Sequence, residues 1–305
     1  MSIPAPVGIR AVFVTWNPDP GRLYDAVQSV AEQVDGVIVV DNGSDNRATL
    51  VDHYAASDQV TVVPLADNLG IGAALNVGVR LALLEDPTWI VTMDQDTLVS
   101  AGAVRGILHD YAALDEHLVR NCGILALRPH PQPASIWLTR YAESLLVLRD
   151  CGAFTERRGV ITSGNLIRSD VARHIRFNES LFIDQVDFDF CSSLRRHHYI
   201  VLQQRAITTD HLLGERYDGV VKDHPYENAQ RFYYIVRNST YLVLRGRLVV
   251  RYYAAQIVVI AGAFVSVNGV GSLLLGVGII ARAVLDAVLG RMGRREYQFL
   301  RRGRR

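Results

Sequence analysis

The sequence predicts an α/β fold with a mainly parallel central sheet and flanking helices, followed by a region of apolar helices at the C-terminus. This prediction rests on three observations. Short β-branched and apolar runs alternate with amphipathic stretches between residues 9 and 93, as expected for parallel strands joined by right-handed crossovers. Polar residues follow the ends of three of these runs, and residues 252–281 contain no charged side chain.

The elements of the N-terminal half follow from the periodicity of its apolar residues. We predict strands over residues 9–15, 37–40, 60–64 and 89–93, and helices over residues 21–33, over 46–55 and beginning within 68–78. The first helix places Leu23, Val27 and Val30 on one face. The run VIVV at 37–40 has no polar interruption, which is typical of a strand that is covered on both faces.

Polar residues that follow the predicted strands mark a candidate ligand site. They are Asn17, residues 41–44 and residues 94–96. Because the ligands of open α/β sheets bind beside the carboxyl ends of the strands, we expect these three segments to face one crevice.

The remainder of the chain divides by composition. Residues 121–220 are typical of a mixed α+β region with polar loops, and residues 224–250 predict a long helix rich in aromatic and basic residues. We therefore predict one catalytic domain over residues 1–222, in which residues 1–120 and residues 121–222 form two subregions, and C-terminal helices over 223–305.

Bulk composition excludes several classes of protein. The 305 residues are 49% apolar, enough for a sizeable core, and a net charge of +1 gives no reason to expect nucleic-acid binding. Cys122, Cys151 and Cys191 are widely spaced, so neither a zinc site nor a disulfide framework is predicted. The N-terminal segment lacks a basic stretch followed by an apolar run, so we expect no signal peptide and a cytoplasmic location.

Asp94 and Asp96 stand two residues apart at the end of a predicted strand. If the chain stays extended there, both side chains project to one side and Gln95 projects to the other. Paired carboxylates suit Mg²⁺ or Mn²⁺, which would also bind a diphosphate and assist its departure as a leaving group. The alternative is a polar turn that happens to contain two aspartates.

Two further polar segments admit both a structural and a functional interpretation. Residues 41–44 (DNGS) have the composition of a β-turn followed by a helix N-cap; alternatively, Asp41 accepts a hydrogen bond from a pyrimidine base. The segment with Asn68, Gly70 and Asn76 offers close backbone approach and helix N–H groups to an anion. Alternatively, it is a glycine-containing loop and helix packed against the sheet.

Four segments, taken in order, resemble the inverting glycosyltransferases of family 2: VTWNPD, VVDNGS, DNLGIGAALNVG and MDQDT. The resemblance implies the α/β fold called GT-A, and the sequence around the central Gln of MDQDT is similar to the rhamnosyltransferase branch. Trp16 stands where that branch more often has Tyr. Residues 182–196 resemble the acceptor-site segment of the branch, although Val186-Asp187 stands where many relatives have Glu-Asp. The resemblance spans roughly residues 9–245.

The resemblance implies a role for individual residues, with the nucleotide sugar bound mainly by residues 1–120 and the acceptor by residues 121–222. The nucleotide would be bound by Thr15, Asn17, Asp41, Asn68, Gly70, Asn76 and Asp94. A Mn²⁺ or Mg²⁺ ion would be coordinated by Asp94, Asp96 and His211. The donor sugar and the acceptor would be contacted by Ser163, Gly164, Asn165, Asp184 and Asp189. Asp187 would be the catalytic base.

The second acidic cluster can also be assessed from its chemistry. A sugar hydroxyl is a poor nucleophile and needs a base within hydrogen-bond distance. Asp187 suits this role if burial and a neighbouring carboxylate raise its pKa. The alternative is that Asp184, Asp187 and Asp189 line a solvated loop before a helix, with Asp189 in its first turn. A lone histidine is more often structural, and His211 as a ligand would favour Mn²⁺ over Mg²⁺.

The uncharged segment 252–281 is longer than a bilayer requires. Basic residues flank it on both sides, and eight arginines follow it: residues 282, 291, 294, 295, 301, 302, 304 and 305. Because basic clusters favour the cytoplasmic side, we expect a hairpin broken near Asn268-Gly269, or helices lying in the interface, at the inner face of the cell membrane. The arginines would then meet anionic headgroups. The alternative is a buried helical pair or an interface in a homo-oligomer.

These observations predict a metal-dependent inverting glycosyltransferase that moves L-rhamnose from dTDP-L-rhamnose onto a glycan. A polyprenyl-linked saccharide of cell-envelope polysaccharide synthesis is the expected acceptor. UDP-galactofuranose, UDP-glucose and UDP-N-acetylhexosamine are alternative donors. A sugar-1-phosphate nucleotidyltransferase would need a basic glycine-rich loop where this chain has VTWNPDP, and a non-catalytic membrane scaffold would not need intact Asp94, Asp96, Asp187 and His211.

Overall fold

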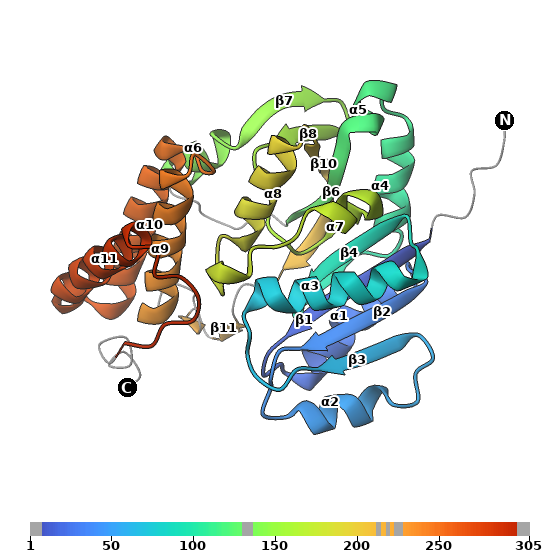
Figure 1. The fold of residues 1–305 in the computed structure, drawn as a ribbon, viewed down its shortest axis with the longest axis horizontal. Coiled ribbons are helices and arrows are strands. Elements are labelled where there is room, and N and C mark those ends of the chain that lie inside the picture. The colour runs from blue at the N-terminus through green and yellow to red at the C-terminus, as the bar shows by residue number, and fades with distance from the viewer. Residues whose placement is uncertain (1–7, 130–136, 212–214, 218–219, 223–227, 298–305) are drawn as a thin grey trace.

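A computed structural model describes residues 8–129, 137–211, 215–217, 220–222 and 228–297 (Figure 1). Its centre is a 10-stranded sheet with helices on both faces. The strand order is β3 (Val60–Pro64), β2 (Gly36–Asp41), β1 (Ile9–Thr15), β4 (Trp89–Asp94), β9 (Asn165–Arg168), β6 (Cys122–Pro129), β10 (Ile200–His211), β8 (Phe154–Arg157) and β7 (Val147–Cys151), and β5 (Thr97–Val99) pairs with β10.

The direction of the strands changes across the sheet. Strands β3, β2, β1 and β4 pair in parallel, as predicted. Strand β9 is antiparallel to both β4 and β6, while β6 and β10 are parallel and β8 and β7 continue antiparallel. The predicted α/β class is therefore confirmed, with a parallel N-terminal half and a mixed half beyond β4.

The helices that connect the parallel strands follow the predicted pattern. They are α1 (Pro20–Ala31), α2 (Arg47–Tyr54) and α3 (Ile71–Ala82). Asp19 caps α1 by accepting a hydrogen bond of 3.0 Å from the Arg22 N–H, and Pro20 occupies the first turn, where no N–H is needed. The predicted apolar face of this helix is fully buried against the sheet.

The remaining helices before the C-terminal region lie around the large sheet. They are α4 (Ala103–Ala112), α5 (Glu116–Asn121), α6 (Trp137–Ser144), α7 (Ser169–His174), α8 (Val186–Arg196) and the short helices η1 (Leu83–Glu85) and η2 (Glu179–Leu181). A small separate sheet is formed by β11 (Glu215–Tyr217) and β12 (Val220–Lys222). Helices α3, α7 and α8 cover the same face of the large sheet, and α1 and α4 cover the other (Figure 1).

The C-terminal helices lie together at one end of the molecule, next to α8 (Figure 1). They are α9 (Ala229–Leu244), α10 (Val250–Asn268), η3 (Val270–Ser272) and α11 (Leu273–Val288). The predicted helix over 224–250 begins only at Ala229, where Asn228 caps it through an acceptor bond of 2.8 Å from Gln230 N–H. Residues 223–227 lie outside the described residues. The predicted break falls at Gly269, whose φ of 79° is left-handed and therefore suits glycine.

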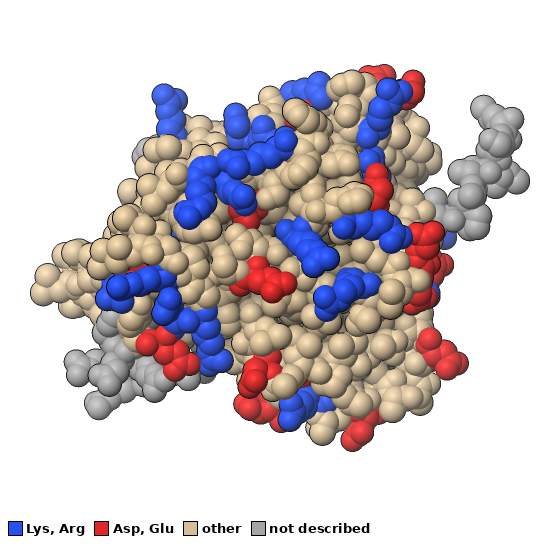
Figure 2. All heavy atoms as spheres, viewed as in Figure 1, with Lys and Arg blue, Asp and Glu red and all other residues tan. Residues whose placement is uncertain are grey.

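Two helical segments in the described portion of the chain are long and apolar enough to cross a membrane, Val250–Asn268 and Val270–Val288. Most of their side chains are not buried within the protein. The protruding end of the molecule that they form carries no acidic or basic residue (Figure 2). The exposed apolar side chains at this end, here called the hairpin tip, are Val267, Val270, Leu273, Leu274 and Val277.

Candidate active site

The carboxyl ends of β2, β1 and β4 lie side by side, because the strand register pairs Thr15 with Asp41 and Val14 with Asp94. The polar segments after these strands are therefore brought to one edge of the sheet, as the sequence predicted. This edge is the place at which open α/β sheets bind ligands.

The two aspartates of the DQD segment do not lie on an extended strand. Strand β4 ends at Asp94, and Gln95 and Asp96 form a turn that leads into β5. The expected alternation of side chains is therefore wrong, because the chain turns before Asp96. The turn still keeps both carboxylates at the edge of the sheet, and the Asp94 N–H donates a hydrogen bond of 3.0 Å to Ser163 Oγ.

Gln95 joins the DQD turn to the end of β1. Its Oε1 accepts hydrogen bonds of 2.9 Å from both Thr15 Oγ1 and the Trp16 N–H. In the sequence Gln95 is only the residue between two aspartates, and no local pattern indicates this role. Thr15, which was expected near the nucleotide, thus uses its hydroxyl hydrogen to hold the turn.

Asp41 stabilises its own turn. Its carboxylate accepts hydrogen bonds from the N–H of Ser44, at 3.2 Å, and from the Ser44 hydroxyl, and the residue is fully buried. These bonds are the ones that the turn interpretation predicts. Asn17 connects the same turn to β1, since its N–H donates to Ser44 Oγ at 2.7 Å and its Oδ1 accepts from Asp45 N–H at 2.8 Å.

The loop before α3 packs directly on this turn. Asn68 Oδ1 accepts hydrogen bonds from Asn42 Nδ2, at 3.1 Å, and from the Gly70 N–H, at 3.0 Å. Asn42 Oδ1 in turn accepts from the Leu69 N–H at 2.9 Å. The two asparagines therefore fix the loops at the ends of β2 and β3 as one unit, and Asn68 remains beside the predicted nucleotide site.

Gly70 does permit a close approach, but the approaching group belongs to the protein. A Cβ at this position would lie 2.6 Å from the carbonyl oxygen of Phe182, and that oxygen accepts a hydrogen bond of 2.7 Å from the Ile71 N–H. The loop before α8 therefore takes the first N–H of this helix, as the packing alternative predicts.

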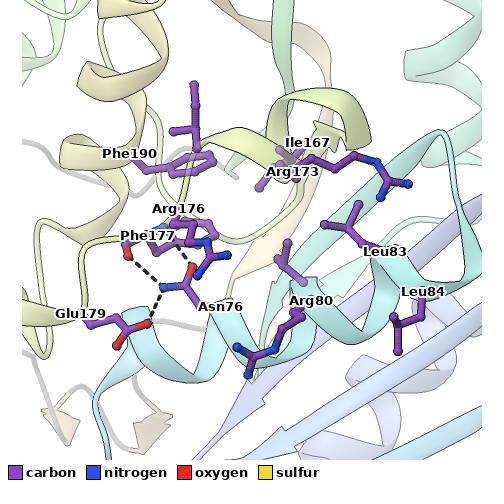
Figure 3. Close-up of a pocket in the computed structure, with 13 residues that line it drawn as sticks. Asn76, Arg80, Leu83, Leu84, Ile167, Arg173, Arg176, Phe177, Glu179 and Phe190 are labelled. Atoms are coloured by element: carbon purple, nitrogen blue, oxygen red, sulfur yellow. Dashed lines mark hydrogen bonds between the residues drawn. The ribbon is translucent and has the colours of Figure 1, made fainter.

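Asn76 lies away from the edge of the sheet, on the outer side of α3. Its Nδ2 donates to Phe177 O and to Glu179 Oε1, each at 2.9 Å, and its Oδ1 accepts from Phe177 N–H at 3.0 Å (Figure 3). These bonds engage both ends of the amide and hold Asn76 against residues 177–179. The neighbouring cavity of about 390 Å³ also contains Arg80 and Arg176, whose guanidinium groups do not converge on it (Figure 3).

The segment 163–165 is buried beside the DQD turn. Ser163 accepts the Asp94 N–H described above, and the Gly164 N–H donates to Thr92 O at 2.9 Å. Asn165 is also buried, and its Nδ2 donates to Ile161 O at 2.7 Å. This loop therefore supports the backbone around Asp94.

Asp187 lies in the first turn of α8 and belongs to the same site. Burial, together with the negative charges of Asp184 and Asp94, raises its pKa from 3.8 to about 7. A hydrogen bond of 2.8 Å from the Phe188 N–H acts in the opposite direction but is outweighed. Two acidic segments far apart in the chain thus act on one another, and a carboxyl group with this pKa can accept a proton near neutral pH.

The two neighbouring aspartates are held by arginines from the C-terminal region. Asp184 forms an ion pair of 3.0 Å with Arg231 of α9, and Asp189 forms one of 2.5 Å with Arg247, which precedes α10. Asp189 is almost completely buried, so its charge is compensated inside the protein rather than by solvent. Both ion pairs therefore tie the segment around Asp187 to the C-terminal region.

The expected metal ligands come from two adjoining strands. His211 is the last residue of β10, and its backbone pairs with Thr97, which directly follows Asp96. The side chain of His211 lies outside the described residues. Among the side chains that the structure describes, no three His, Cys, Asp or Glu residues form a metal-binding group. The chemistry still fits a divalent cation, because Asp94 and Asp96 are hard oxygen ligands and the negative charge at this edge already raises the pKa of Asp187.

Comparison with known proteins agrees with this geometry. Residues 11–119 match the family model described as glycosyl transferase family 2. The chain is 28% identical over 243 residues to a protein of Shigella flexneri named dTDP-rhamnosyl transferase RfbF, and the match covers 78% of this chain and 80% of that protein.

The fold is also similar to a solved structure, that of GalNAc-T7 with UDP, GalNAc and Mn²⁺. The TM-score is 0.57, with 13% sequence identity over 77% of this chain and 48% of the other. This chain therefore spans about half the length of GalNAc-T7, and the similarity supports the fold alone.

Proposed function

We propose that the protein is a metal-dependent glycosyltransferase that inverts the anomeric centre. Support comes from the match of residues 11–119 to the model of glycosyl transferase family 2 and from a fold of the GT-A type. The substrate would be a nucleoside diphosphate sugar, bound at the ends of β1, β2 and β4. The acceptor would be a glycan hydroxyl, approached from the side of α8.

The observation that carries this proposal is the position and pKa of Asp187. A carboxyl group with a pKa of about 7 is deprotonated in a large fraction of the molecules at neutral pH, yet basic enough to accept a proton from an attacking hydroxyl. The influence of Asp94 on this pKa supports a base next to the aspartates expected to hold the diphosphate. One base beside one diphosphate site is sufficient for a single displacement.

In the proposed reaction, the oxygen of the acceptor hydroxyl attacks the anomeric carbon while Asp187 accepts the proton of that hydroxyl. The bond from that carbon to the diphosphate oxygen breaks, and the electron pair leaves with the nucleoside diphosphate. Asp94 and Asp96, with His211, would hold a Mn²⁺ or Mg²⁺ ion that acts as a Lewis acid on the leaving group. Asp184 and Asp189 keep the segment of the base in place through Arg231 and Arg247.

Nucleotide recognition in this proposal differs from the sequence prediction at several residues. Asp41 maintains the turn at residues 41–44. In this proposal the nucleobase of the donor therefore contacts the surface formed by this turn and Asn17. Asn68 orders the adjoining loop through Asn42. Thr15 holds the DQD turn through Gln95. In this proposal, these residues hold the turns and loops that form the nucleotide site and do not themselves bind the nucleobase.

The proposed donor is dTDP-L-rhamnose. Support comes from the similarity to the Shigella flexneri dTDP-rhamnosyl transferase, together with the branch resemblance of the DQD segment. UDP-galactofuranose, UDP-glucose and UDP-N-acetylhexosamine are the competing donors. These donors share the diphosphate and differ from dTDP-L-rhamnose in the nucleobase and the sugar. Comparing them therefore tests which nucleobase and sugar the protein selects.

The proposed acceptor is a lipid-linked glycan at the inner face of the cell membrane. The apolar hairpin tip (Val267, Val270, Leu273, Leu274, Val277) is exposed and lies in a segment without charge, which suits insertion into the interfacial layer of a bilayer. The tail arginines were expected to contact anionic headgroups. Three of them form ion pairs within the protein instead: Arg282 and Arg291 with Asp286, and Arg294 with Glu296. Residues 301–305 lie outside the described residues.

A donor screen tests the proposal. Purified protein with Mn²⁺ is titrated with dTDP-rhamnose, UDP-glucose, UDP-galactofuranose and a GDP-sugar, and release of the nucleoside diphosphate is followed with and without a membrane extract as acceptor. Preferential binding of dTDP-rhamnose, with release that requires Mn²⁺, is the expected result. Equal binding of all donors would remove the rhamnose assignment, and no release from any donor would remove the transferase assignment.

A further inference from the structure

The loop that leads into α8 has a backbone that its own sequence does not favour. Phe182, Asp184 and Gln185 have φ values of 67°, 62° and 64°, in the left-handed region that side chains other than glycine rarely adopt. Such backbone persists only where surrounding contacts determine it. Because Gln185 directly precedes α8, the conformation of this loop decides where Asp187 lies.

Asn238 of α9 supplies the contacts that hold the loop. Its Nδ2 lies within hydrogen-bond distance of three backbone carbonyl oxygens, which share its two hydrogens: Leu181 at 3.0 Å, Ile183 at 2.7 Å and Asp184 at 2.9 Å. The residue is 0% exposed, so water cannot replace these bonds if the amide is removed. One side chain thus fixes a carbonyl group just before the left-handed backbone and two carbonyl groups within it.

Arg237 completes the arrangement beside it. Its Nε donates to Asn238 Oδ1 at 2.9 Å and orients that amide, while its Nη2 donates to Leu181 O at 2.9 Å and its Nη1 to Gly293 O at 2.7 Å. Arg237 is also fully buried, and among the described residues its guanidinium has hydrogen bonds to oxygen atoms but no ion pair with a carboxylate. The guanidinium also lies over the rings of Tyr233 and Tyr234, at 5.6 and 4.8 Å from their centroids, so its charge is compensated by oxygen atoms and aromatic faces and its geometry is fixed.

The loop is held on its opposite side by the nucleotide-binding half. The Ile71 N–H donates to Phe182 O, and Gly70 leaves the space for this contact. On the C-terminal side, the Gly293 N–H also donates to Ser180 O at 2.6 Å. The loop before Asp187 is therefore fixed between the start of α3 and the group formed by α9 and the segment after α11.

We propose that Arg237 and Asn238 are positioning residues that hold loop 181–185 and thereby place Asp187 for proton transfer. This inference rests on the proposed function of Asp187 as the base. Neither side chain contacts the nucleotide edge, so their loss acts on the chemical step and leaves donor binding intact. The C-terminal helices thus act on the catalytic step itself, in addition to any contact with a membrane.

The decisive variant is Asn238→Asp, which keeps the size of the side chain and gives Arg237 a carboxylate partner but cannot donate to the three carbonyl groups. We expect kcat to fall about 100-fold, as a displaced catalytic group does, with an unchanged KM for the donor and an unchanged dissociation constant in calorimetry. Ser239→Ala is the matched control. Its hydroxyl is also fully buried on α9, but it donates to Gln256 of α10 at 2.9 Å rather than to the loop.

The outcomes separate this inference from the proposed function. Wild-type kcat in Asn238→Asp, with Asp187→Asn inactive, would overturn the positioning role alone, and an equal loss in Ser239→Ala would reduce it to general packing. Full activity of Asp187→Asn would instead overturn the base assignment. If Asn238→Asp does not fold, as judged by circular dichroism, Arg237→Lys is measured in its place. Lysine keeps the charge but cannot bind Leu181 O, Gly293 O and Asn238 Oδ1 in the same planar arrangement, so wild-type kcat in that variant would also overturn the inference.

Discussion

Burial raises the pKa of Asp187, in the first turn of α8, and the negative charges of Asp184 and of Asp94, at the end of β4, add to this effect. The carboxyl groups of Asp94 and Asp187 come from the two halves of the catalytic domain and meet across its edge. In the proposed reaction a diphosphate site and a proton acceptor are therefore adjacent. This relationship can be tested by changing either the proton acceptor or the turn that carries the diphosphate site.

Replacing the catalytic base should abolish sugar transfer but leave binding of the donor unchanged. Asp187→Asn keeps the shape of the side chain and removes its ability to accept a proton, so kcat should fall by about 10² to 10⁴. Binding of dTDP-rhamnose, measured by calorimetry, should be retained. Asp170→Asn, at an exposed carboxylate of α7 that pairs with Arg168, is the control and should remain active. Retained transfer by Asp187→Asn would exclude this residue as the base.

The same substitution should stabilise the protein at alkaline pH. Between pH 3.8 and about 7 the folded state holds a proton on Asp187 that the unfolded state has lost, so the free energy of unfolding decreases as the pH rises through this interval. Asp187→Asn removes this contribution. In urea unfolding without divalent metal, the variant should exceed wild type by about 2 to 4 kcal/mol at pH 8, and by little below pH 4. Identical pH profiles for the two proteins would contradict the raised pKa.

Gln95 should control the DQD turn. Gln95→Ala removes the acceptor of Thr15 Oγ1 and the Trp16 N–H, which costs about 1 to 3 kcal/mol where the donors become unsatisfied. We expect weaker binding of Mn²⁺ and of the nucleoside diphosphate, with the helices intact by circular dichroism. Gln28→Ala, at an exposed position on α1, serves as control. Equal affinities in the two variants would show that the turn needs no support from Gln95.

The ion pair of Asp189 and Arg247 should contribute to stability. Arg247→Ala leaves a buried carboxylate without its partner, and removing one member of a buried pair costs about 3 to 5 kcal/mol. The double variant Asp189→Asn/Arg247→Ala should recover some of this loss because no buried charge remains. Urea unfolding of the single variants Arg247→Ala and Asp189→Asn and of the double variant gives the coupling energy between the two residues. Strict additivity of their effects would mean that the pair is not coupled.

Membrane binding should depend on the hairpin tip. Leu274 is 84% exposed at this tip, and Leu84 is 77% exposed on the catalytic domain. Leu274→Glu should reduce sedimentation with phosphatidylglycerol vesicles, because a carboxylate cannot enter the apolar layer and is repelled by the anionic surface, whereas Leu84→Glu should not. Equal sedimentation of both variants would instead favour an interface between copies of the chain, which analytical ultracentrifugation would detect.

Much of the fold is determined by the sequence by itself, because its signals are local. The runs IRAVFVT and VIVV, the face of Leu23, Val27 and Val30, and the break at Gly269 depend on neighbouring residues, and all appear where they were predicted. The meeting of the ends of β1, β2 and β4 follows from parallel connectivity, so the general location of the site was also determined.

Only the tertiary structure decided what each polar side chain contacts. Gly70 accommodates Phe182 rather than a ligand, Asn76 binds the backbone of Phe177, and Asp41 binds Ser44. Asn238 holds a loop that lies far from it in the sequence. Residue type limits which hydrogen bonds a side chain can form, but the partner is set by how distant segments pack, and the same asparagine or aspartate satisfies its hydrogen bonds equally well with backbone or with ligand.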